Sequence, residues 1–525
     1  VYYLRFCPVG ADHILEHLPD ARDLPELGSG FRILHISSCF PRKGIAPLLE
    51  AYAQQFDSND AVTLIVKTFP NPHDDMASMI SAWRKRHPRG ARIQLINRDL
   101  AAGAIRALYQ QCQVLVAPSR GEGFGLPMAE AMLHRLPVIT TAYGGQRDFC
   151  NEQNAWLVDY TFEFADTHMA MPDSVWADPD VKHLGEIVLR LYHTFNSGDW
   201  ERSTRDKVTK AFDLVSTQYS WEALSSRFLQ ALDHLDQQPV AKARPKLGCI
   251  TTWNTKCGIA TYSKLLLEPA LNECLIFANS NVNLIGNDGV NVARCWLSGQ
   301  ADDLKPLYNA ILATKIDQVL IQFNFAFFEL GAFKNLLALL ASSGIDIFIT
   351  FHSTADVNEG NHSKSLALLL PELQHAARLF VHSVSDLNNL KRFGLAANTT
   401  LFPHGVKTDI VPTARENELA QLQGKTIIST YGFLLPHKGT RNLIEAFYGV
   451  AMAYPDTHLL LVNAIYPAEV SSQEAQSCHQ LIKDLSLGDR VTLLTDFLED
   501  AESLASLNLS SFIVFPYEYT QESSS

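Results

Sequence analysis

The sequence predicts an α/β protein built from Rossmann-like, doubly wound parallel sheets in tandem. Short runs rich in Val, Ile and Leu alternate with amphipathic helical segments through the first half of the chain. This alternation is typical of a parallel sheet with helices on both faces. The second observation is an internal repeat. A Lys-Gly turn at residue 43 recurs at residue 438, which is 395 positions later, and the segments after it recur in the same order.

The first half of the chain supplies the predicted elements in order. The predicted strands are Phe31–Ser37, Ala61–Lys67, Arg92–Asn97, Val114–Ala117 and Pro137–Ile139. The predicted helices are Ala46–Gln55, Met76–Arg86, Ala102–Gln111 and Trp221–Leu235, of which the last closes the first module. Sheets of this kind bind ligands beyond the carboxyl ends of their strands, so the loops after these strands are the expected place of a site.

The repeat covers four ordered matches. Pro41-Arg42-Lys43-Gly44 recurs as Pro436-His437-Lys438-Gly439, and each is followed by a helix of the same apolar pattern. The three later matches pair Val62–Val66 with His458–Val462, Arg92–Ile96 with Arg490–Leu494, and Val114–Pro118 with Phe512–Pro516. The chain is therefore predicted to contain one module twice.

A polar, proline-containing stretch separates the copies. Gln237–Lys246 has no apolar periodicity, and we interpret it as an interdomain linker. A fresh α/β pattern begins after it, with predicted strands at Leu247–Thr252, Gln318–Gln322, Ile345–Phe351 and Leu379–His382. This segment has no counterpart at the front of the chain.

Composition excludes some classes of partner and site. The formal net charge of −13 argues against a nucleic-acid partner. The nine cysteines are scattered and none forms a Cys-x-x-Cys pair, so zinc and dithiol chemistry have no support and buried thiols in a reducing compartment are expected. No apolar stretch reaches the ~20 residues of a membrane helix. We expect a cytoplasmic protein. Because Val1 already stands in a predicted strand, we also expect the sequence to be a fragment with residues missing at both ends.

The strongest motif follows the strand Val114–Ala117 and runs into a helix. Three glycines, Gly121, Gly123 and Gly125, let the backbone approach a ligand and leave amides at a helix N-terminus, where an anion is favoured. Glu122 lies in this loop and Glu130 lies eight positions later on the helix. Two carboxylates placed in this way can each accept hydrogen bonds from vicinal sugar hydroxyls.

Residues from Phe31 to about Gly145 closely resemble the nucleotide-sugar-binding half of retaining glycosyltransferases with the GT-B fold. The resemblance is to the large group known as glycosyltransferase family four. The family's hallmarks are a Lys-Gly turn and a Glu-x7-Glu motif, present here as Lys43-Gly44 and Glu122…Glu130. The resemblance implies that Glu122 holds hydroxyls of the transferred sugar, Glu130 the ribose and Lys43 the diphosphate. It assigns the backbone of the glycine turn to the sugar and phosphate, through Gly121, Gly123, Phe124, Gly125 and Leu126.

One departure from the family concerns the diphosphate. Many relatives carry an arginine a few residues before the Lys-Gly turn, where this chain has Ser37-Ser38-Cys39-Phe40. Lys43 then acts alone, or together with Arg42 or with Arg120.

The segment after the linker resembles the acceptor half of the same fold. Gly258, in a loop that opens a helix, would lie beside the donor phosphates, and His352, after a strand, would lie near the reaction centre. His404 is interpreted as structural. In the second donor half, Lys438 repeats Lys43, and Glu522 is the candidate first glutamate of a pair whose second member falls beyond the last residue.

The predicted organisation follows from the resemblance. Residues 1–236 form the C-terminal, nucleotide-sugar-binding half of a first GT-B module, and 237–246 form the linker. Residues 247–412 form the N-terminal acceptor half of a second module, and 413–525 form its truncated donor half.

The leading hypothesis is a glycosyltransferase that moves a hexose, with mannose from GDP-mannose as the named candidate, onto a glycan or lipid-linked glycan of a bacterial surface polysaccharide. No cofactor is expected beyond the nucleotide sugar, and no metal, because no Asp-x-Asp site is evident. Peripheral association with the inner membrane face, at a membrane-bound acceptor, is left open. The alternatives are a phosphorylase or sucrose-type synthase on the same fold, and a degenerate module that serves as a glycan-binding or scaffold unit.

Overall fold

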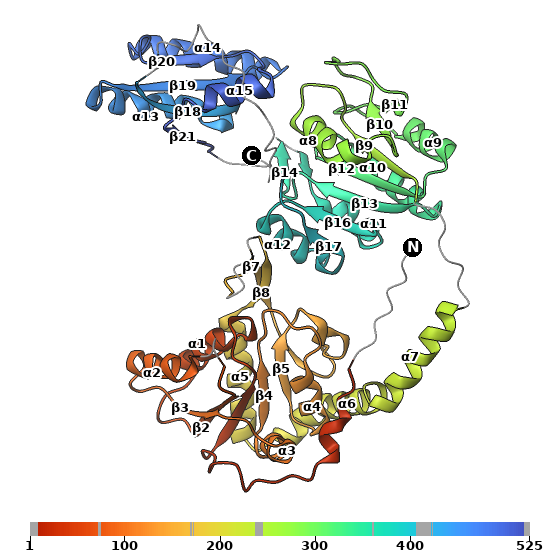
Figure 1. Ribbon diagram of the computed structural model, residues 1–525, viewed down its shortest axis with the longest axis vertical. Helices are drawn as coiled ribbons and strands as arrows, with labels where there is room; N and C mark the ends of the chain where they lie inside the picture. Colours follow the sequence, from red (N-terminus) through yellow and green to blue (C-terminus); the bar gives the residue numbers. More distant parts are fainter. Residues whose placement is uncertain are drawn as a thin grey trace. The chain divides into compact units, whose positions relative to one another are not determined.

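The computed structural model describes residues 9–71, 75–167, 171, 173–236, 245–359, 362–405, 422 and 424–518. The chain divides into two compact units, Val1–Arg244 and Pro245–Ser525 (Figure 1). Each unit is organised around parallel β-sheets with helices packed on them, which confirms the predicted α/β class of doubly wound parallel sheets.

The first unit is built on a six-stranded sheet in the order β3-β2-β1-β4-β5-β6. All of its neighbouring strands pair in parallel. The chain therefore winds outward from β1 in one direction and returns to continue from β4 in the other. The reversal between β1 and β4 is the switch point at which doubly wound sheets bind ligands. The elements are η1 Asp12–Glu16, β1 Phe31–Ile36, η2 Pro41–Lys43, α1 Ile45–Gln55, β2 Val62–Thr68, α2 Met76–Arg86, β3 Arg92–Asn97, α3 Ala102–Gln111, β4 Val114–Ala117, α4 Leu126–Leu133, β5 Val138–Thr141, η3 Gly145–Asp148, β6 Trp156–Val158, β7 Tyr160–Phe164, β8 Val175–Pro179, α5 Val181–Asn196, α6 Trp200–Gln218 and α7 Trp221–Asp236.

Two apolar cores, one on each face, hold the helices on this sheet. Successive strand residues such as Ile33 and Leu34 point to opposite faces of the sheet. One core packs the strands against α1, α2 and α5, and the other packs them against α3, α4 and α6. Strands buried on both faces explain the continuous apolar runs in the sequence.

The second unit begins with a seven-stranded sheet in the order β11-β10-β9-β12-β13-β16-β17, again parallel throughout. Its elements are β9 Leu247–Thr251, α8 Gly258–Leu267, η4 Glu268–Ala270, β10 Cys274–Asn279, β11 Val292–Trp296, α9 Lys305–Thr314, β12 Gln318–Phe323, α10 Leu330–Ser342, β13 Asp346–Phe351, β14 Val357–Glu359, β15 His362–Lys364, η5 Leu366–Leu369, α11 Leu370–Gln374, β16 Arg378–Val381, α12 Val384–Arg392, η6 Ala396–Asn398 and β17 Thr399–Leu401.

A four-stranded parallel sheet, in the order β20-β19-β18-β21, completes the described part of the second unit. Its elements are β18 Thr426–Phe433, η8 Pro436–Lys438, α13 Thr440–Ala453, β19 Thr457–Ala464, α14 Glu469–Asp484, β20 Val491–Leu494, α15 Asp500–Leu507 and β21 Phe512–Ile513. Counted from its own first strand, this sheet repeats the 3-2-1-4 order of the first unit.

The structure differs from the predicted elements in a few places. The antiparallel hairpin of β7 and β8 was not predicted, nor were β10, β11 and β17. β2 lies one residue later than predicted and α1 begins one residue earlier. The linker prediction lies outside the described residues except for Pro245 and Lys246, and the boundary predicted at residue 412 also lies outside them.

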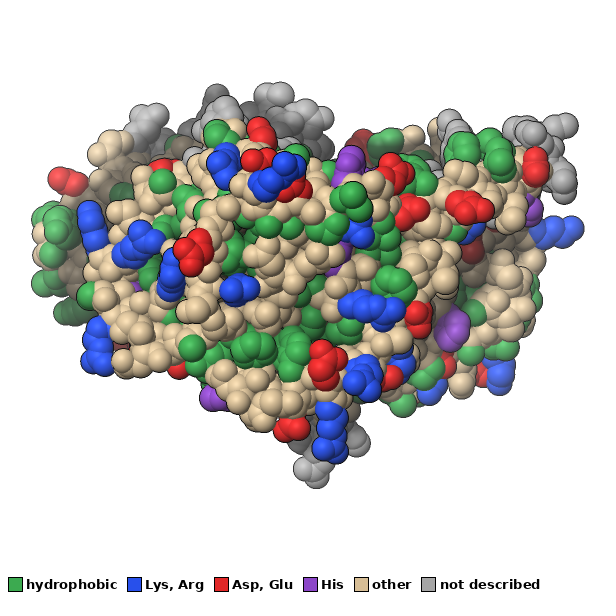
Figure 2. Space-filling view, turned by 90° about the horizontal axis from the view of Figure 1, so that it is seen from below, with side chains coloured by type: hydrophobic (Ala, Val, Ile, Leu, Met, Phe, Trp, Pro, Cys, Tyr) green, Lys and Arg blue, Asp and Glu red, His purple; other side chains and the backbone are tan. Residues whose placement is uncertain are grey.

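The surface charges, the cysteine thiols and the helix lengths can be compared with the predictions made from composition. On the face shown in Figure 2, the described basic side chains are interspersed with acidic and uncharged ones. The eight described cysteines carry free thiols, and six of them are buried. Among the described residues, no helix is both long and apolar enough to cross a membrane.

Candidate functional site

The Lys-Gly turn lies at the carboxyl end of β1, directly beside the loop that follows β4. Gly44 adopts a left-handed conformation with φ of 73°. A Cβ added to it would lie 1.8 Å from the carbonyl oxygen of Pro118, so no side chain fits. Because β1 and β4 are neighbours in the sheet, this close approach places the two loops together at the switch point.

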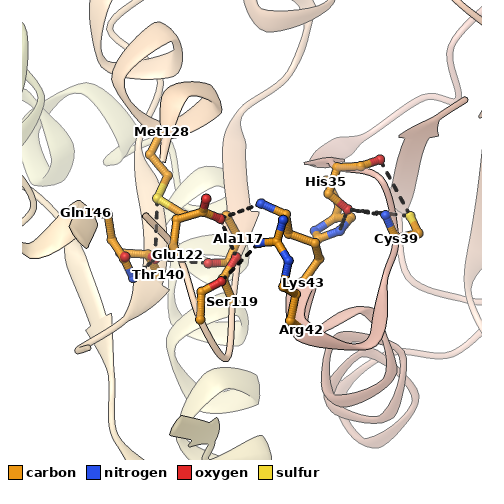
Figure 3. A network of polar contacts seen from close by, with 12 residues as sticks. His35, Cys39, Arg42, Lys43, Ala117, Ser119, Glu122, Met128, Thr140 and Gln146 are labelled. Carbon is orange, nitrogen blue, oxygen red and sulfur yellow. Dashed lines mark hydrogen bonds and ion pairs between the residues drawn. The ribbon is translucent and has the colours of Figure 1, made fainter. Parts of the chain in front are cut away.

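Lys43 and Glu122 meet across these two loops (Figure 3). The Lys43 ammonium lies 2.6 Å from Glu122 Oε2, and both side chains are nearly buried, at 14% and 12% exposure. The Ser119 hydroxyl donates to the same oxygen at 3.3 Å. Oε1 of Glu122 has no hydrogen-bond partner among the described residues, and it is free to accept from a ligand.

The two arginines that could assist Lys43 have different environments. The Arg120 guanidinium pairs with Asp178 and lies 4.3 Å over the Trp176 ring, both on the β7–β8 hairpin. Arg42 is exposed and donates to the Gly121 carbonyl at 3.2 Å. Arg120 is therefore occupied by the hairpin, and Lys43 is the cation held against the Glu122 carboxylate.

A buried histidine, His35, lies on β1 shortly before the stretch Ser37–Phe40. His35 is 1% exposed, with Nδ1 donating to the Val116 carbonyl at 2.8 Å and Nε2 lying 2.8 Å from the Ser37 hydroxyl. Burial, and to a smaller extent the positive charge of Lys43, lowers the pKa of His35 to about 4. His35 is therefore neutral at pH 7 and adds no positive charge beside Lys43.

The glycine turn before α4 is open on one side and tightly packed on the other. A Cβ on Gly121 or Gly123 would meet nothing within 4 Å, whereas Gly125 has φ of 94° and is confined. The Gly145 amide donates to the Glu122 carbonyl at 2.8 Å, which fixes the turn against η3. Backbone amides at this open side can reach a ligand, as the three-glycine motif predicts.

Two other predicted residues of this turn have packing roles. The Phe124 ring lies 5.1 Å from that of Phe149, and Leu126 at the start of α4 packs against the same core. Any contact of these two residues with a ligand is therefore left to their backbone.

Glu130 has partners other than the Lys43 and Glu122 pair. It is buried at 8% exposure, accepts a 2.8 Å hydrogen bond from the Tyr109 hydroxyl, and lies 3.5 Å from His13 Nε2. No hydrogen bond or ion pair joins it to Lys43 or Glu122 in the described part of the chain. Burial raises the pKa of Glu130 although Tyr109 and His13 act to lower it.

This pKa shift makes the stability of the protein depend on Glu130 and pH. A carboxyl whose pKa is raised in the folded state contributes most to the free energy of unfolding below its unfolded pKa of ~4.3. That contribution is lost as pH rises through the folded pKa. Relative to the wild type, Glu130→Gln is expected to become progressively more stable as pH rises above the unfolded pKa and through the raised folded pKa of Glu130. Urea unfolding at each pH measures this, with Glu163→Gln on the exposed part of β7 as control. A difference in the free energy of unfolding between Glu130→Gln and the wild type that stays constant with pH would contradict a raised pKa of Glu130.

The turn of the second copy has the same backbone geometry. Gly439 has φ of 69°, and a Cβ on it would lie 1.9 Å from the Pro516 carbonyl oxygen. The Lys438 ammonium lies 4.0 Å over the Tyr517 ring. Pro516 corresponds to Pro118, so the same spacing puts Thr520 at the place of Glu122. Both Thr520 and the predicted Glu522 lie outside the described residues.

In the seven-stranded sheet, the predicted residues lie at the carboxyl ends of strands. Gly258 begins α8 after β9, and a Cβ on it would meet nothing within 4 Å. His352 follows β13, is 1% exposed, and its Nε2 lies 2.8 Å from Gln322 Oε1. Its ring also lies within 6.3 Å of those of His382 and His404, and 5.0 Å from that of Tyr262 on α8. His352 is thus one of a group of histidines rather than an isolated one.

Several residues of these sites were not identified from the sequence. Ser119, Tyr109 and His13 each contact a predicted glutamate. Only Ser119, inside the glycine motif itself, carried a signal that sequence reading could have used. Tyr109 on α3 and His13 on η1 reach Glu130 through packing of elements that are distant in the sequence.

Part of the first unit is similar to known protein sequences. Residues 30–170 match the family model described as glycosyl transferases group 1. A sucrose synthase from Melioribacter roseus is 26% identical over 137 residues, covering 26% of this chain and 15% of the relative. The GtfA subunit of a UDP-N-acetylglucosamine–peptide N-acetylglucosaminyltransferase from Limosilactobacillus reuteri is 31% identical over 91 residues, 17% of each chain. This chain thus spans about a sixth of the length of these curated relatives.

Solved structures are similar over a larger part of the chain. Anabaena HepE in complex with UDP and glucose is 15% identical, with a TM-score of 0.40 over 53% of this chain and 76% of that one. Sucrose-phosphate synthase from Thermosynechococcus elongatus is 18% identical, with a TM-score of 0.41 over 53% and 77%.

Proposed function

We propose, starting from the match of residues 30–170 to glycosyl transferases group 1, that the first unit carries the donor site of a retaining glycosyltransferase. The observation that carries this proposal is the nearly buried ion pair of Lys43 and Glu122 at the switch point of the sheet. A lysine and a carboxylate shielded from water at the place where such sheets bind ligands suit a ligand with both phosphate and hydroxyl groups.

Each group of the pair has a role in this reaction. Lys43 stabilises the negative charge that builds on the diphosphate as the sugar leaves, and amides at the open side of the glycine turn assist it. Glu122 accepts hydrogen bonds from sugar hydroxyls through Oε1 and keeps Oε2 for Lys43 and Ser119. The acceptor hydroxyl attacks the same face that the diphosphate leaves, so positioning and electrostatic stabilisation carry the catalysis.

The remaining parts of the chain complete the proposed organisation. The sheet of β9 to β17 serves as an acceptor half, with Gly258 beside the donor phosphates and His352 near the reaction centre. Residues 1–236 and 413–525 are two donor halves, and a GT-B site forms where a donor half meets an acceptor half. A glycan or lipid-linked glycan is the acceptor, and membrane association, where it occurs, is peripheral.

A second function is favoured for the repeated donor half. At the spacing fixed by Pro516, Thr520 stands where the first copy has Glu122, and the predicted Glu522 comes two residues later. With a hydroxyl at that place Lys438 would lack the ion pair of Lys43, so the second copy is a candidate for a module that binds without catalysing transfer.

Donor binding tests the proposal directly. Calorimetric titrations of the chain with GDP-mannose, UDP-glucose and UDP-N-acetylglucosamine are expected to show one preferred donor. Because Lys43 acts on the diphosphate, the matching nucleoside without phosphate should bind about 10- to 100-fold more weakly than the nucleoside diphosphate.

A pair of lysine variants supplies the control. Lys43→Met should weaken binding of the nucleoside diphosphate by about the same 10- to 100-fold, whereas Lys85→Met, on the exposed side of α2, should leave it unchanged. Failure of all three donors to bind would favour the glycan-binding or scaffold alternative. Equal binding by the two lysine variants would remove Lys43 from the site.

A further inference from the structure

Three histidines gather at one edge of the seven-stranded sheet. His352, His382 and His404 follow β13, β16 and β17, which are consecutive neighbours in the sheet and run in parallel. The carboxyl ends of parallel neighbours meet at the same edge, so the topology itself brings the three imidazoles together. One ring nitrogen of each lies within 4.8 Å of the others. The rings of His382 and His404 are closest, with centroids 3.9 Å apart.

The hydrogen bonds of two of these histidines fix where their lone pairs lie. His382 Nδ1 lies 2.8 Å from the Phe402 carbonyl, which can only accept, so Nδ1 carries the proton and Nε2 carries the lone pair. His352 Nε2 donates in the same way to Gln322 Oε1, which leaves the lone pair on Nδ1. This arrangement, in which one nitrogen donates to an oxygen and the other is unprotonated, is the one that orients a metal-binding histidine.

Three ring nitrogens of this group are buried and have no hydrogen-bond partner among the described residues. They are the unprotonated His352 Nδ1 and His382 Nε2, together with His404 Nε2. His352 and His382 are 1% and 7% exposed. A buried polar atom without a partner costs free energy, so an unpartnered group of three calls for a ligand.

We propose that His352, His382 and His404 form a site for a transition-metal ion of the zinc class. Three imidazole nitrogens suit Zn²⁺ and its neighbours in the first row rather than Mg²⁺ or Ca²⁺, which prefer oxygen ligands. At the usual Zn–N distance of ~2.0–2.1 Å, tetrahedral ligands lie roughly 3.4 Å apart, so nitrogens that are up to 4.8 Å apart approach by up to about 1.4 Å on binding. Three protein ligands leave the fourth position for water or another oxygen ligand.

Tyr262 closes one side of this site. Its ring packs edge-on against all three imidazoles, with centroid distances of 5.0, 5.2 and 5.0 Å to His352, His382 and His404. These contacts limit the rotation of the imidazole rings. The rings therefore move together with Tyr262 when they approach one another to bind a metal ion.

The proposal departs from the expectation of no metal, and the binding of the ion itself does not depend on the proposed function. That expectation considered Asp-x-Asp motifs and Cys-x-x-Cys pairs, whereas the three histidines are 30 and 22 residues apart in the sequence, which no local motif reveals. A metal on Nδ1 would make His352 unavailable to any reaction, so occupancy is expected to lower transfer activity while metal binding itself is measured without a substrate.

Zinc binding by the whole chain tests the site. Equilibrium dialysis with Zn²⁺ alone should find one tight site per chain, and competition with a chromophoric chelator should give its affinity. His382→Ala and His404→Ala should each weaken that site by at least about 100-fold, and Gln322→Leu, which removes the partner of His352, by about 10- to 100-fold. The matched control is His375→Ala, an exposed histidine directly after α11 of the same unit, which should bind as the wild type does.

A second measurement uses the wild-type chain, so it does not depend on whether a variant folds. Co²⁺ added to the wild-type chain should give the visible absorption of a four-coordinate site without the near-ultraviolet bands of cobalt–thiolate bonds. Equal affinity in His382→Ala and His375→Ala would overturn the proposal. So would cobalt–thiolate bands, or an absorption typical of six-coordinate Co²⁺.

Discussion

Replacing Glu122 by glutamine is expected to reduce nucleotide-sugar binding by about 10- to 100-fold and to abolish transfer. Glutamine preserves the shape of the side chain but removes the charge that strengthens hydrogen bonds from sugar hydroxyls, which are worth about 1.5–3 kcal/mol. It also leaves the Lys43 ammonium, 14% exposed, without its partner. Removing one member of a buried pair costs about 3 kcal/mol, so the free energy of unfolding should fall as well.

The two effects separate in a double-mutant cycle measured by urea unfolding and by calorimetric titration with the preferred nucleotide sugar. Lys43→Met combined with Glu122→Gln should recover most of the lost stability, because neither variant then leaves a buried charge unpaired, but it should not recover binding. The control is Asp20→Asn at the exposed Arg22 pair, which should change stability little. Additive losses of stability at positions 43 and 122 would show that the pair is not coupled, and unchanged binding in Glu122→Gln would refute its role.

The second large effect is expected for Gly44→Ala. The φ of 73° alone costs a residue with a Cβ about 1–2 kcal/mol. The added Cβ would also meet the Pro118 carbonyl oxygen at 1.8 Å, which forces the two loops apart. The total loss should exceed about 3 kcal/mol, measured by urea unfolding, and donor binding should fall because Lys43 follows the displaced turn.

Gly198→Ala separates backbone strain from the collision. Gly198 has φ of 81°, but a Cβ there would meet nothing within 4 Å, so it should lose only about 1–2 kcal/mol. Gly439→Ala meets the Pro516 carbonyl at 1.9 Å and should resemble Gly44→Ala. Similar losses at positions 44 and 198 would mean that the two loops accommodate the Cβ freely.

The sheets were predictable because their strands are buried on both faces. Runs such as Val114–Ala117 are apolar at every position, and the helices between them have one apolar side. The β7–β8 hairpin was not predictable in the same way. Its strand Tyr160–Phe164 alternates buried and exposed residues and is short, and its role depends on Asp178 reaching Arg120.

The candidate donor site was predictable only in part. Lys43 and Glu122 follow strands whose pairing brings their loops together, so a local motif after each strand was enough to nominate both. The position of Glu130 was not, because a helix residue eight positions from Glu122 can face the ligand or the interior. Its contacts with Tyr109 and His13 depend on how α3 and η1 pack.

The sequence by itself determined the alternation of strands and helices, the recurrence of the Lys-Gly turn, and the residues that follow each strand. These are local properties, set by periodicity and by the few conformations that glycine turns require. The tertiary structure alone decided that Arg120 is occupied by Asp178, that Glu130 binds Tyr109, and that His352, His382 and His404 share one edge of a sheet. Those contacts join residues from elements separated along the chain. The order in which parallel strands pair brings the three histidines together, whereas the contacts of Arg120 and Glu130 depend on how a hairpin and helices pack against the sheet.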